Sequence, residues 1–259
     1  MKIGVFDSGL GGLLVLKNVR EVIPEYDYVF FGDQAFVPYG NKTKEELYER
    51  AKIIFTYLFE KHSCKVILLA CNTTSTNIYN ELKEWVKENF PDREIWGIVK
   101  PTVEAVRAKE DIVFFGTHLT VSSHAYKKEM EKLGRENIIE IQMPELCTMI
   151  ENDIPTFEYI KSFNHLNDNL DYTGVLVCTH YGIAREDFKK TYPQIKNWIV
   201  QEDIVPEYIQ NYLREKISLE KSLSCGQILQ IFVSNESPVF KNFTQKWFPN
   251  QAVQFIEKL

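Results

Sequence analysis

Two cysteines carry the strongest chemical signal in this sequence. Cys71 and Cys178 each end an apolar run and open a polar turn, with Asn72-Thr73 after the first and Thr179-His180 after the second. A thiol in this setting is expected at the N-terminus of a helix, where the helix dipole lowers the thiol pKa. His180 and Asp7 are suitable proton partners for such thiols. We therefore expect both cysteines to be catalytic.

Two reactive thiols fit three kinds of chemistry. A redox pair usually needs a CxxC motif, which the sequence lacks, and a cysteine hydrolase built on Cys178 and His180 has no evident third group to orient the histidine. Proton transfer by two bases fits best, because one thiolate can remove a proton from one side of a carbon while the opposite thiol supplies another. The remaining cysteines, Cys64, Cys147 and Cys225, lack this setting, and we predict that they are structural.

The five cysteines predict neither a disulfide framework nor a metal site. Their number is odd, and no cysteine and histidine stand at a zinc-ligand spacing. We therefore expect each thiol to act singly.

A glycine-rich turn at residues 7–12 follows the first apolar run. The backbone N–H groups of such a turn can hold an anion at a helix N-terminus. Its spacing matches neither GxGxxG nor the P-loop, and Asp7 would repel a phosphate. We expect a small ligand whose carboxylate meets the N–H groups and Ser8, while Asp7 meets an ammonium group or orients a catalytic group. The alternative is a tight turn in which Asp7 caps a helix.

The segments that must position these residues alternate between strand and helix patterns. The predicted strands are residues 2–6, 26–31, 65–70, 94–99, 111–116, 137–143, 173–178 and 196–200. Amphipathic segments such as 13–23 and 43–62 predict helices between them. This alternation predicts an α/β fold with a mainly parallel sheet, in which ligands bind at the carboxyl ends of the strands.

The chain shows signs of an internal duplication. A Val-Phe pair near residue 5 returns near residue 113, and each half holds one cysteine tripeptide. We predict two pseudosymmetric, doubly wound parallel-sheet domains with the active site between them. The first domain takes residues 1–95 plus 208–259, because 224–233 reads as a further strand and 237–248 as a closing helix, and the second takes residues 96–207.

Composition excludes several classes of protein. The 259 residues carry 30 Lys and Arg against 36 Asp and Glu, a net charge of −6, and no long run of one sign, so nucleic acid is a poor partner. No stretch approaches the roughly 20 apolar residues of a membrane span, and no signal-peptide pattern is present. We expect a cytoplasmic protein.

Seven motifs together resemble, in order and spacing, the cofactor-independent glutamate racemases of the aspartate/glutamate racemase superfamily. They are GVFDSGLGGLLVL, FGDQAFVPYG, LLACNTTST, GIVKPTVEA, FGTHLTVSSHAY, LVCTHYG and SNESPVFKNF. The resemblance covers nearly the whole chain. It implies an isomerase that interconverts L- and D-glutamate without a cofactor, supplies D-glutamate for peptidoglycan, and forms a homodimer.

The resemblance also implies a role for each site residue. Cys71 and Cys178 are the acid/base pair, assisted by Asp7, His180 and Glu151. The implied substrate contacts are Asp7, Ser8, Tyr39, Gly40, Asn72, Thr73, Thr117, Thr120, Thr179 and His180.

Some positions depart from the family pattern. Gly182 stands where proline is usual, Val177 where glycine is common, and Phe36 where arginine is common. The glycine predicts a looser hinge beside Cys178. The rival interpretations are an aspartate racemase or related isomerase, and an amino-acid binding or regulatory protein on the same fold; the two retained thiols argue against a single-cysteine decarboxylase.

Overall fold

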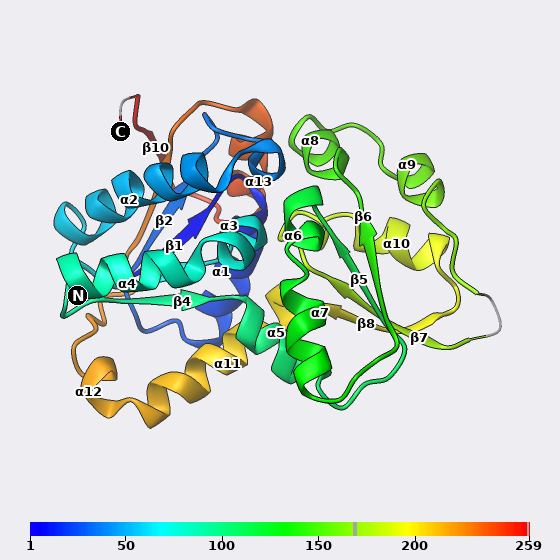
Figure 1. Ribbon diagram of the computed structural model, residues 1–259. Helices are drawn as coiled ribbons and strands as arrows, with labels where there is room; N and C mark the ends of the chain where they lie inside the picture. The colour runs from blue at the N-terminus through cyan, green and yellow to red at the C-terminus, as the bar shows by residue number, and fades with distance from the viewer. Residues whose placement is uncertain (168–169, 258) are drawn as a thin grey trace.

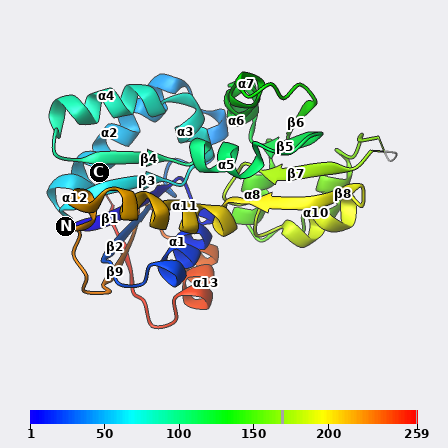
Figure 2. The ribbon, with the colours of Figure 1, turned by 90° about the horizontal axis from the view of Figure 1, so that it is seen from below.

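The computed structural model describes residues 1–167, 170–257 and 259. Two parallel β-sheets lie side by side, and helices flank each of them (Figures 1 and 2). The predicted α/β class with two parallel sheets is therefore confirmed.

The first sheet has the strand order β10-β9-β2-β1-β3-β4. Its strands are β1 (Lys2–Asp7), β2 (Tyr28–Gly32), β3 (Cys64–Leu69), β4 (Glu94–Gly97), β9 (Leu229–Val233) and β10 (Val253–Phe255). The second sheet has the order β6-β5-β7-β8. Its strands are β5 (Ile112–Gly116), β6 (Ile138–Gln142), β7 (Tyr172–Leu176) and β8 (Ile195–Val200).

Helices connect nearly all of these strands. Around the first sheet they are α1 (Gly11–Val22), the short 3-10 helix η1 (Tyr39–Asn41), α2 (Lys44–Glu60), α3 (Asn72–Asn77), α4 (Tyr79–Asn89), α12 (Ile217–Glu220) and α13 (Pro238–Trp247). Around the second sheet they are α6 (His118–Ser122), α7 (Ala125–Lys132), α8 (Leu146–Glu151), α9 (Phe157–Lys161) and α10 (Arg185–Thr191). The chain crosses to the second sheet through α5 (Val99–Val106) and returns through α11 (Gln201–Glu215), which packs against α1 and α5.

Neighbouring residues of β1 show how each sheet buries both faces. Val5 packs into the core that contains α1, whereas Phe6 faces α2 and meets the ring of Phe55 edge-on at 5.4 Å. In the second sheet, Phe114 faces α7 and Phe115 faces α10. Strands buried on both faces read as continuous apolar runs, which is why the sequence indicates them so clearly.

The differences from the predicted elements lie at the ends. The predicted strand 94–99 stops at Gly97, because α5 begins at Val99. Strand β10 was not anticipated, since its three residues are partly exposed and form no apolar run. The predicted domain limits stay a prediction; they cut β4 after residue 95 and α11 after residue 207. None of the helices in the described ranges combines the length and apolar character that a membrane span requires.

Candidate active site

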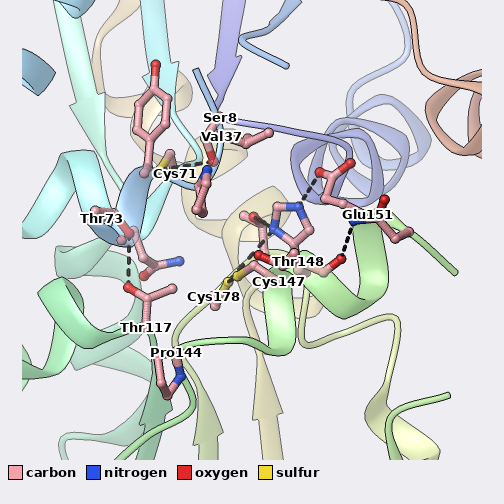
Figure 3. A pocket seen from close by; sticks show the side chains of 17 residues that line it. Ser8, Val37, Cys71, Thr73, Thr117, Pro144, Cys147, Thr148, Glu151 and Cys178 are labelled. Atoms are coloured by element: carbon pink, nitrogen blue, oxygen red, sulfur yellow. Dashed lines mark hydrogen bonds and ion pairs between the residues drawn. The ribbon is translucent and has the colours of Figure 1, made fainter. Parts of the chain in front are cut away.

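A cavity of about 180 Å³ lies where the carboxyl ends of the two sheets face each other (Figure 3). Segments next to the first sheet contribute Ser8, Val37, Pro38, Tyr39, Gly40, Cys71, Asn72 and Thr73, and segments next to the second contribute Thr117, Pro144, Cys147, Thr148, Glu151, Asn152, Cys178, Thr179 and His180. The volume is below the range of drug-sized sites, so the cavity suits a small metabolite.

Cys71 lies between β3 and α3, with its sulfur 3.6 Å from Ser8 Oγ. The expectation that the helix dipole lowers its pKa is wrong. Burial raises the pKa of the Cys71 thiol to about 11, and the nearby charge of Asp7 adds to the rise, while bonds with the Thr74 backbone N–H and with Ser8 oppose it. The dipole of a six-residue helix is too weak to offset complete burial. A thiolate formed here is consequently a stronger base than an ordinary one.

Cys178 follows β7, and its predicted place at a helix N-terminus is also wrong. Residues 178–184 form consecutive turns, and α10 begins only at Arg185. These turns bring His180 back toward the thiol, so that Nδ1 lies 3.9 Å from Cys178 Sγ. On the other side of the ring, His180 Nε2 lies 2.6 Å from Glu151 Oε1. The Cys178 thiol, the His180 imidazole and the Glu151 carboxylate therefore form one row of contacting groups.

The charges of these three groups, Cys178, His180 and Glu151, stabilise one another. Burial alone would lower the pKa of His180, but contacts with Cys178 and Glu151 raise it well above its ordinary value. Burial would raise the pKa of Glu151, but His180 holds it below its ordinary range. Burial and the adjacent Cys147 raise the pKa of Cys178, and His180 opposes that rise. The imidazolium supplies the positive charge that a buried Cys178 thiolate needs.

Glu151 also ties α8 to the loop before α1. Its Oε1 accepts the Leu10 N–H at 2.8 Å, and its Oε2 accepts Gln34 Nε2 at 2.9 Å. The Gly9 N–H is likewise occupied, by Asp7 Oδ1 at 2.9 Å. The expectation that these loop N–H groups bind the carboxylate of a ligand fails at both positions, because carboxylates of the protein already fill them.

Cys147 is a site residue that sequence reasoning missed. We expected it to be structural, yet it lines the cavity, and its sulfur lies 3.3 Å from Cys178 Sγ. The signal was present in its spacing. Cys147 stands four residues before Glu151, so a helix over this segment places both side chains on one face. Thr148 and Asn152, on the same helix and just after it, line the cavity as well.

Polar contacts join the two walls across the cavity. Thr73 Oγ1 lies 3.0 Å from Thr117 Oγ1, which is also the N-cap of α6. Asn72 and Gln201, the first residue of α11, exchange two amide hydrogen bonds of 2.6 and 2.8 Å. The Tyr126 hydroxyl from α7 donates to the side-chain amide oxygen of Asn72, Oδ1, at 2.5 Å. These contacts hold the walls in one arrangement.

Two of the predicted site residues, Asp7 and Thr120, stand behind the lining rather than in it. Asp7 Oδ2 accepts the hydroxyl of Thr179 at 3.0 Å, and burial raises the Asp7 pKa to about 6. Thr120 Oγ1 accepts the hydroxyl of Thr117 at 3.0 Å. Each therefore orients a residue that does line the cavity. The other predicted site residues all contribute to the lining.

Gly182 has a local explanation. A Cβ added at this position would meet Glu202 Oε1 at 2.1 Å, so the carboxylate of Glu202 fills the space that a larger residue would take. Burial raises the pKa of Glu202 to about 7. The expectation of a looser hinge is not supported, because the space is packed.

Two close relatives share most of their length with this chain. The glutamate racemase of Fusobacterium nucleatum subsp. nucleatum is 36% identical over 258 residues, which cover 95% of this chain and 93% of that protein. The glutamate racemase of Lactobacillus johnsonii is 30% identical over 259 residues, covering 97% and 95%. The chain belongs to the glutamate racemase family. The resemblance drawn from the motifs is thereby confirmed.

Solved structures of glutamate racemases share the fold of this protein. A glutamate racemase isoform from Bacillus anthracis matches with a TM-score of 0.85 at 22% identity, covering 99% of this chain and 97% of that one. The enzyme from Francisella tularensis, solved with D-glutamate, matches with a TM-score of 0.84 at 24% identity, covering 100% of this chain and 97% of that one. An aspartate racemase from Picrophilus torridus matches with a TM-score of only 0.51 at 18% identity, covering 86% of this chain and 94% of that one. No protein-family model matches the chain.

Proposed function

We propose that this protein is a racemase that interconverts L- and D-glutamate by moving protons between its two thiols and the substrate α-carbon. The observation that carries the proposal is the pair of buried thiols in one cavity, Cys71 from the first sheet and Cys178 from the second (Figure 3). A substrate held between them presents one face of its α-carbon to each sulfur. One thiolate removes the proton, and the opposite thiol delivers another.

The difficulty of this reaction is the weak acidity of the α-proton. Burial helps, because the raised pKa values of both thiols make their thiolates stronger bases. His180, held by Glu151, stabilises the Cys178 thiolate, whereas Cys71 has Ser8 and the Thr74 N–H as hydrogen-bond partners.

The carbanion requires stabilisation as its negative charge moves onto the substrate carboxylate. The hydroxyls of Thr73, Thr117 and Thr179 line the cavity. Within the protein, Thr117 donates to Thr120 and Thr179 donates to Asp7, so these hydroxyls turn away from those acceptors to donate to a bound carboxylate. Hydrogen-bond donors to a developing negative charge typically contribute about 10² to 10³ each in rate. Asp7, through Thr179, and Thr120, through Thr117, act as positioning residues.

A racemisation assay on dialysed protein tests the proposal. We expect conversion of either glutamate enantiomer without added cofactor, and far slower conversion of aspartate and glutamine, because a polar site rejects analogues that leave a group unpaired. Comparable turnover of aspartate would favour the aspartate racemase alternative. Turnover of none of them would leave only a binding or regulatory role.

Single substitutions of the thiols sharpen this assay. Cys71→Ser and Cys178→Ser should each lower racemisation at least about 10³-fold, because a serine hydroxyl is too weak an acid to replace a thiol. Cys64→Ser is the matched control, since Cys64 at the start of β3 is buried and does not line the cavity. Full activity in either cavity variant would contradict the roles given to the thiols.

The wider role of the protein follows from the family resemblance. The D-glutamate it forms supplies peptidoglycan synthesis, and the enzyme works in the cytoplasm as a homodimer. Sedimentation equilibrium tests the dimer, and dependence of growth on added D-glutamate after loss of the protein tests its contribution to the cell wall.

A further inference from the structure

Three potential metal ligands meet on one wall of the cavity. The Sγ atoms of Cys147 and Cys178 are 3.3 Å apart, and Cys178 Sγ lies 3.9 Å from His180 Nδ1. All three ligand atoms lie within 4.8 Å of one another. From these contacts we propose that Cys147, Cys178 and His180 form a binding site for a thiophilic divalent cation such as Zn²⁺, which blocks the racemase when it is bound.

The spacing fits a tetrahedral ion. With Zn–S bonds near 2.3 Å and Zn–N bonds near 2.0 Å, the ligand atoms of a tetrahedral site stand roughly 3.5 to 3.8 Å apart. The distance between the two sulfurs and the distance from Cys178 Sγ to His180 Nδ1 each differ from these tetrahedral separations by less than about 0.5 Å. The remaining pair, the Cys147 sulfur and His180 Nδ1, needs to close by at most about 1.3 Å. Rotation of the two cysteine side chains is sufficient for such a change.

The hydrogen bonds that would orient the ligating histidine are already in place. Glu151 Oε1 contacts His180 Nε2 at 2.6 Å, so this carboxylate holds a proton on Nε2 and leaves Nδ1 as the nitrogen that faces the sulfurs. Glu151 is itself fixed by the Leu10 N–H and by Gln34. A carboxylate bonded to the far nitrogen of a ligating histidine is the usual support of a zinc site. Two thiolates and a neutral imidazole would balance the charge of the ion.

Three protein ligands leave the fourth position open toward the cavity, where water or substrate can bind. When the ion binds, the two thiols release their protons to solvent, and so does Nδ1 if the imidazole is charged. Coordination to the ion then makes the Cys178 thiolate too weak a base to take the α-proton. The ion therefore competes with glutamate. This inhibitory consequence rests on the proposed function, whereas the binding site rests on geometry alone.

Cobalt titration tests the binding site without any assay of activity. Adding Co²⁺ to the reduced protein should produce one equivalent of bound metal, a thiolate-to-cobalt charge-transfer band and the visible bands of tetrahedral cobalt, all displaced by Zn²⁺. Cys147→Ser and Cys147→Ala should bind at least about 100-fold more weakly, with the charge-transfer band reduced. Glu151→Gln, which alters only the group bonded to His180 Nε2, should bind about 10-fold to 100-fold more weakly.

Cys71→Ser is the matched control, because Cys71 lines the same cavity but is not part of the three-residue cluster. It should keep the cobalt spectrum and affinity of the parent protein. The site is overturned if no tetrahedral spectrum forms, if both Cys147 variants bind as tightly as the parent while folding normally, or if Cys71→Ser loses the band. If the protein shows no racemase activity but gives the cobalt spectrum, the proposed function is refuted and the metal site is still supported.

Zinc inhibition then tests the consequence. In the parent, Zn²⁺ should raise the apparent KM for glutamate, and the effect should reverse with a chelator. Each Cys147 variant, compared with its own untreated activity, should need at least about 100-fold more Zn²⁺ for the same inhibition. Equal sensitivity of parent and variants would refute competition through this cluster.

Discussion

His180 is the residue on which the electrostatics of the Cys178 side depends. It stands between a thiol 3.9 Å away, which is buried, and a carboxylate 2.6 Å away, whose side chain is 8% exposed. Burial would make this imidazole neutral, but its two partners raise its pKa well above the ordinary value. Glu151 is therefore a positioning residue that keeps His180 charged.

Replacing Glu151 by Gln tests this dependence. We expect Glu151→Gln to lower the pKa of His180 by at least about one pH unit, because a carboxylate neighbour of an imidazolium shifts its pKa by that order. Titration of the ¹⁵N-labelled imidazole by NMR measures it directly. Glu158→Gln, an exposed glutamate on α9, is the control and should leave the titration unchanged. An unaltered His180 pKa in Glu151→Gln would show that Glu151 does not hold the charge.

Sequence alone could identify the reactive residues but not their surroundings. Cys71, Cys178 and His180 stand at strand ends, which makes their position readable. The pKa values of the two thiols were predicted in the wrong direction, because the extent of burial depends on how two distant halves of the chain close over them. Cys147 was missed for the same reason, since only the fold brings it to Cys178.

At the scale of elements, the strands were the most predictable part of the structure. β1, β3, β5 and β7 are buried along their length and read as apolar runs, so the sequence places them to within about two residues. The turns after β7 were not predictable in this way. Their shape depends on the packing of Gly182 against Glu202 of α11, a contact between separate elements.

This contact predicts how stability changes with pH. Burial raises the Glu202 pKa from an ordinary 4.5 to about 7, so the folded protein binds this proton more tightly than the unfolded chain does. Stability from this group is greatest below about pH 4.5, falls as pH rises toward 7, and is then fully lost. The loss is about 3 kcal/mol at most.

Urea unfolding of the parent and Glu202→Gln measures this loss. The free energy of unfolding of the variant minus that of the parent should be larger at pH 8 than at pH 5, because glutamine does not ionise. Asp7, whose pKa burial raises to about 6, gives the same trend in both proteins and cancels in the difference. A stability difference that does not depend on pH would mean that Glu202 titrates normally in the folded state.

At the scale of the whole molecule, the site belongs to neither sheet alone. Thr73 meets Thr117, Asn72 meets Gln201, and Glu151 on α8 reaches the loop before α1. The substrate is therefore expected to bind and stabilise both halves together. The sequence pointed to two facing halves, but it could not specify these cross-contacts, because they join residues far apart along the chain.

Hydrogen exchange measures this coupling. Saturating glutamate should slow exchange of backbone amides in α3, α6 and α8 together, since all three helices contribute to or adjoin the cavity lining. At 100 times the dissociation constant, binding stabilises the folded protein by about 2.7 kcal/mol. Helix α12, which lies away from the cavity, should show no local protection of its own (Figure 1). Protection confined to the helices of one sheet would contradict a site shared by both.

The central claim is that two different sulfurs serve the two faces of the α-carbon, and isotope incorporation in D₂O tests it most directly. Each enantiomer of glutamate is incubated separately, and the deuterium content of substrate and product is measured by mass spectrometry at low conversion. The account predicts deuterium in the product and protium in the recovered substrate, because Cys71 or Cys178 keeps the removed proton while the other thiol, already exchanged with solvent, delivers deuterium. Equal labelling of substrate and product, or a product that retains the proton of its substrate, would contradict it.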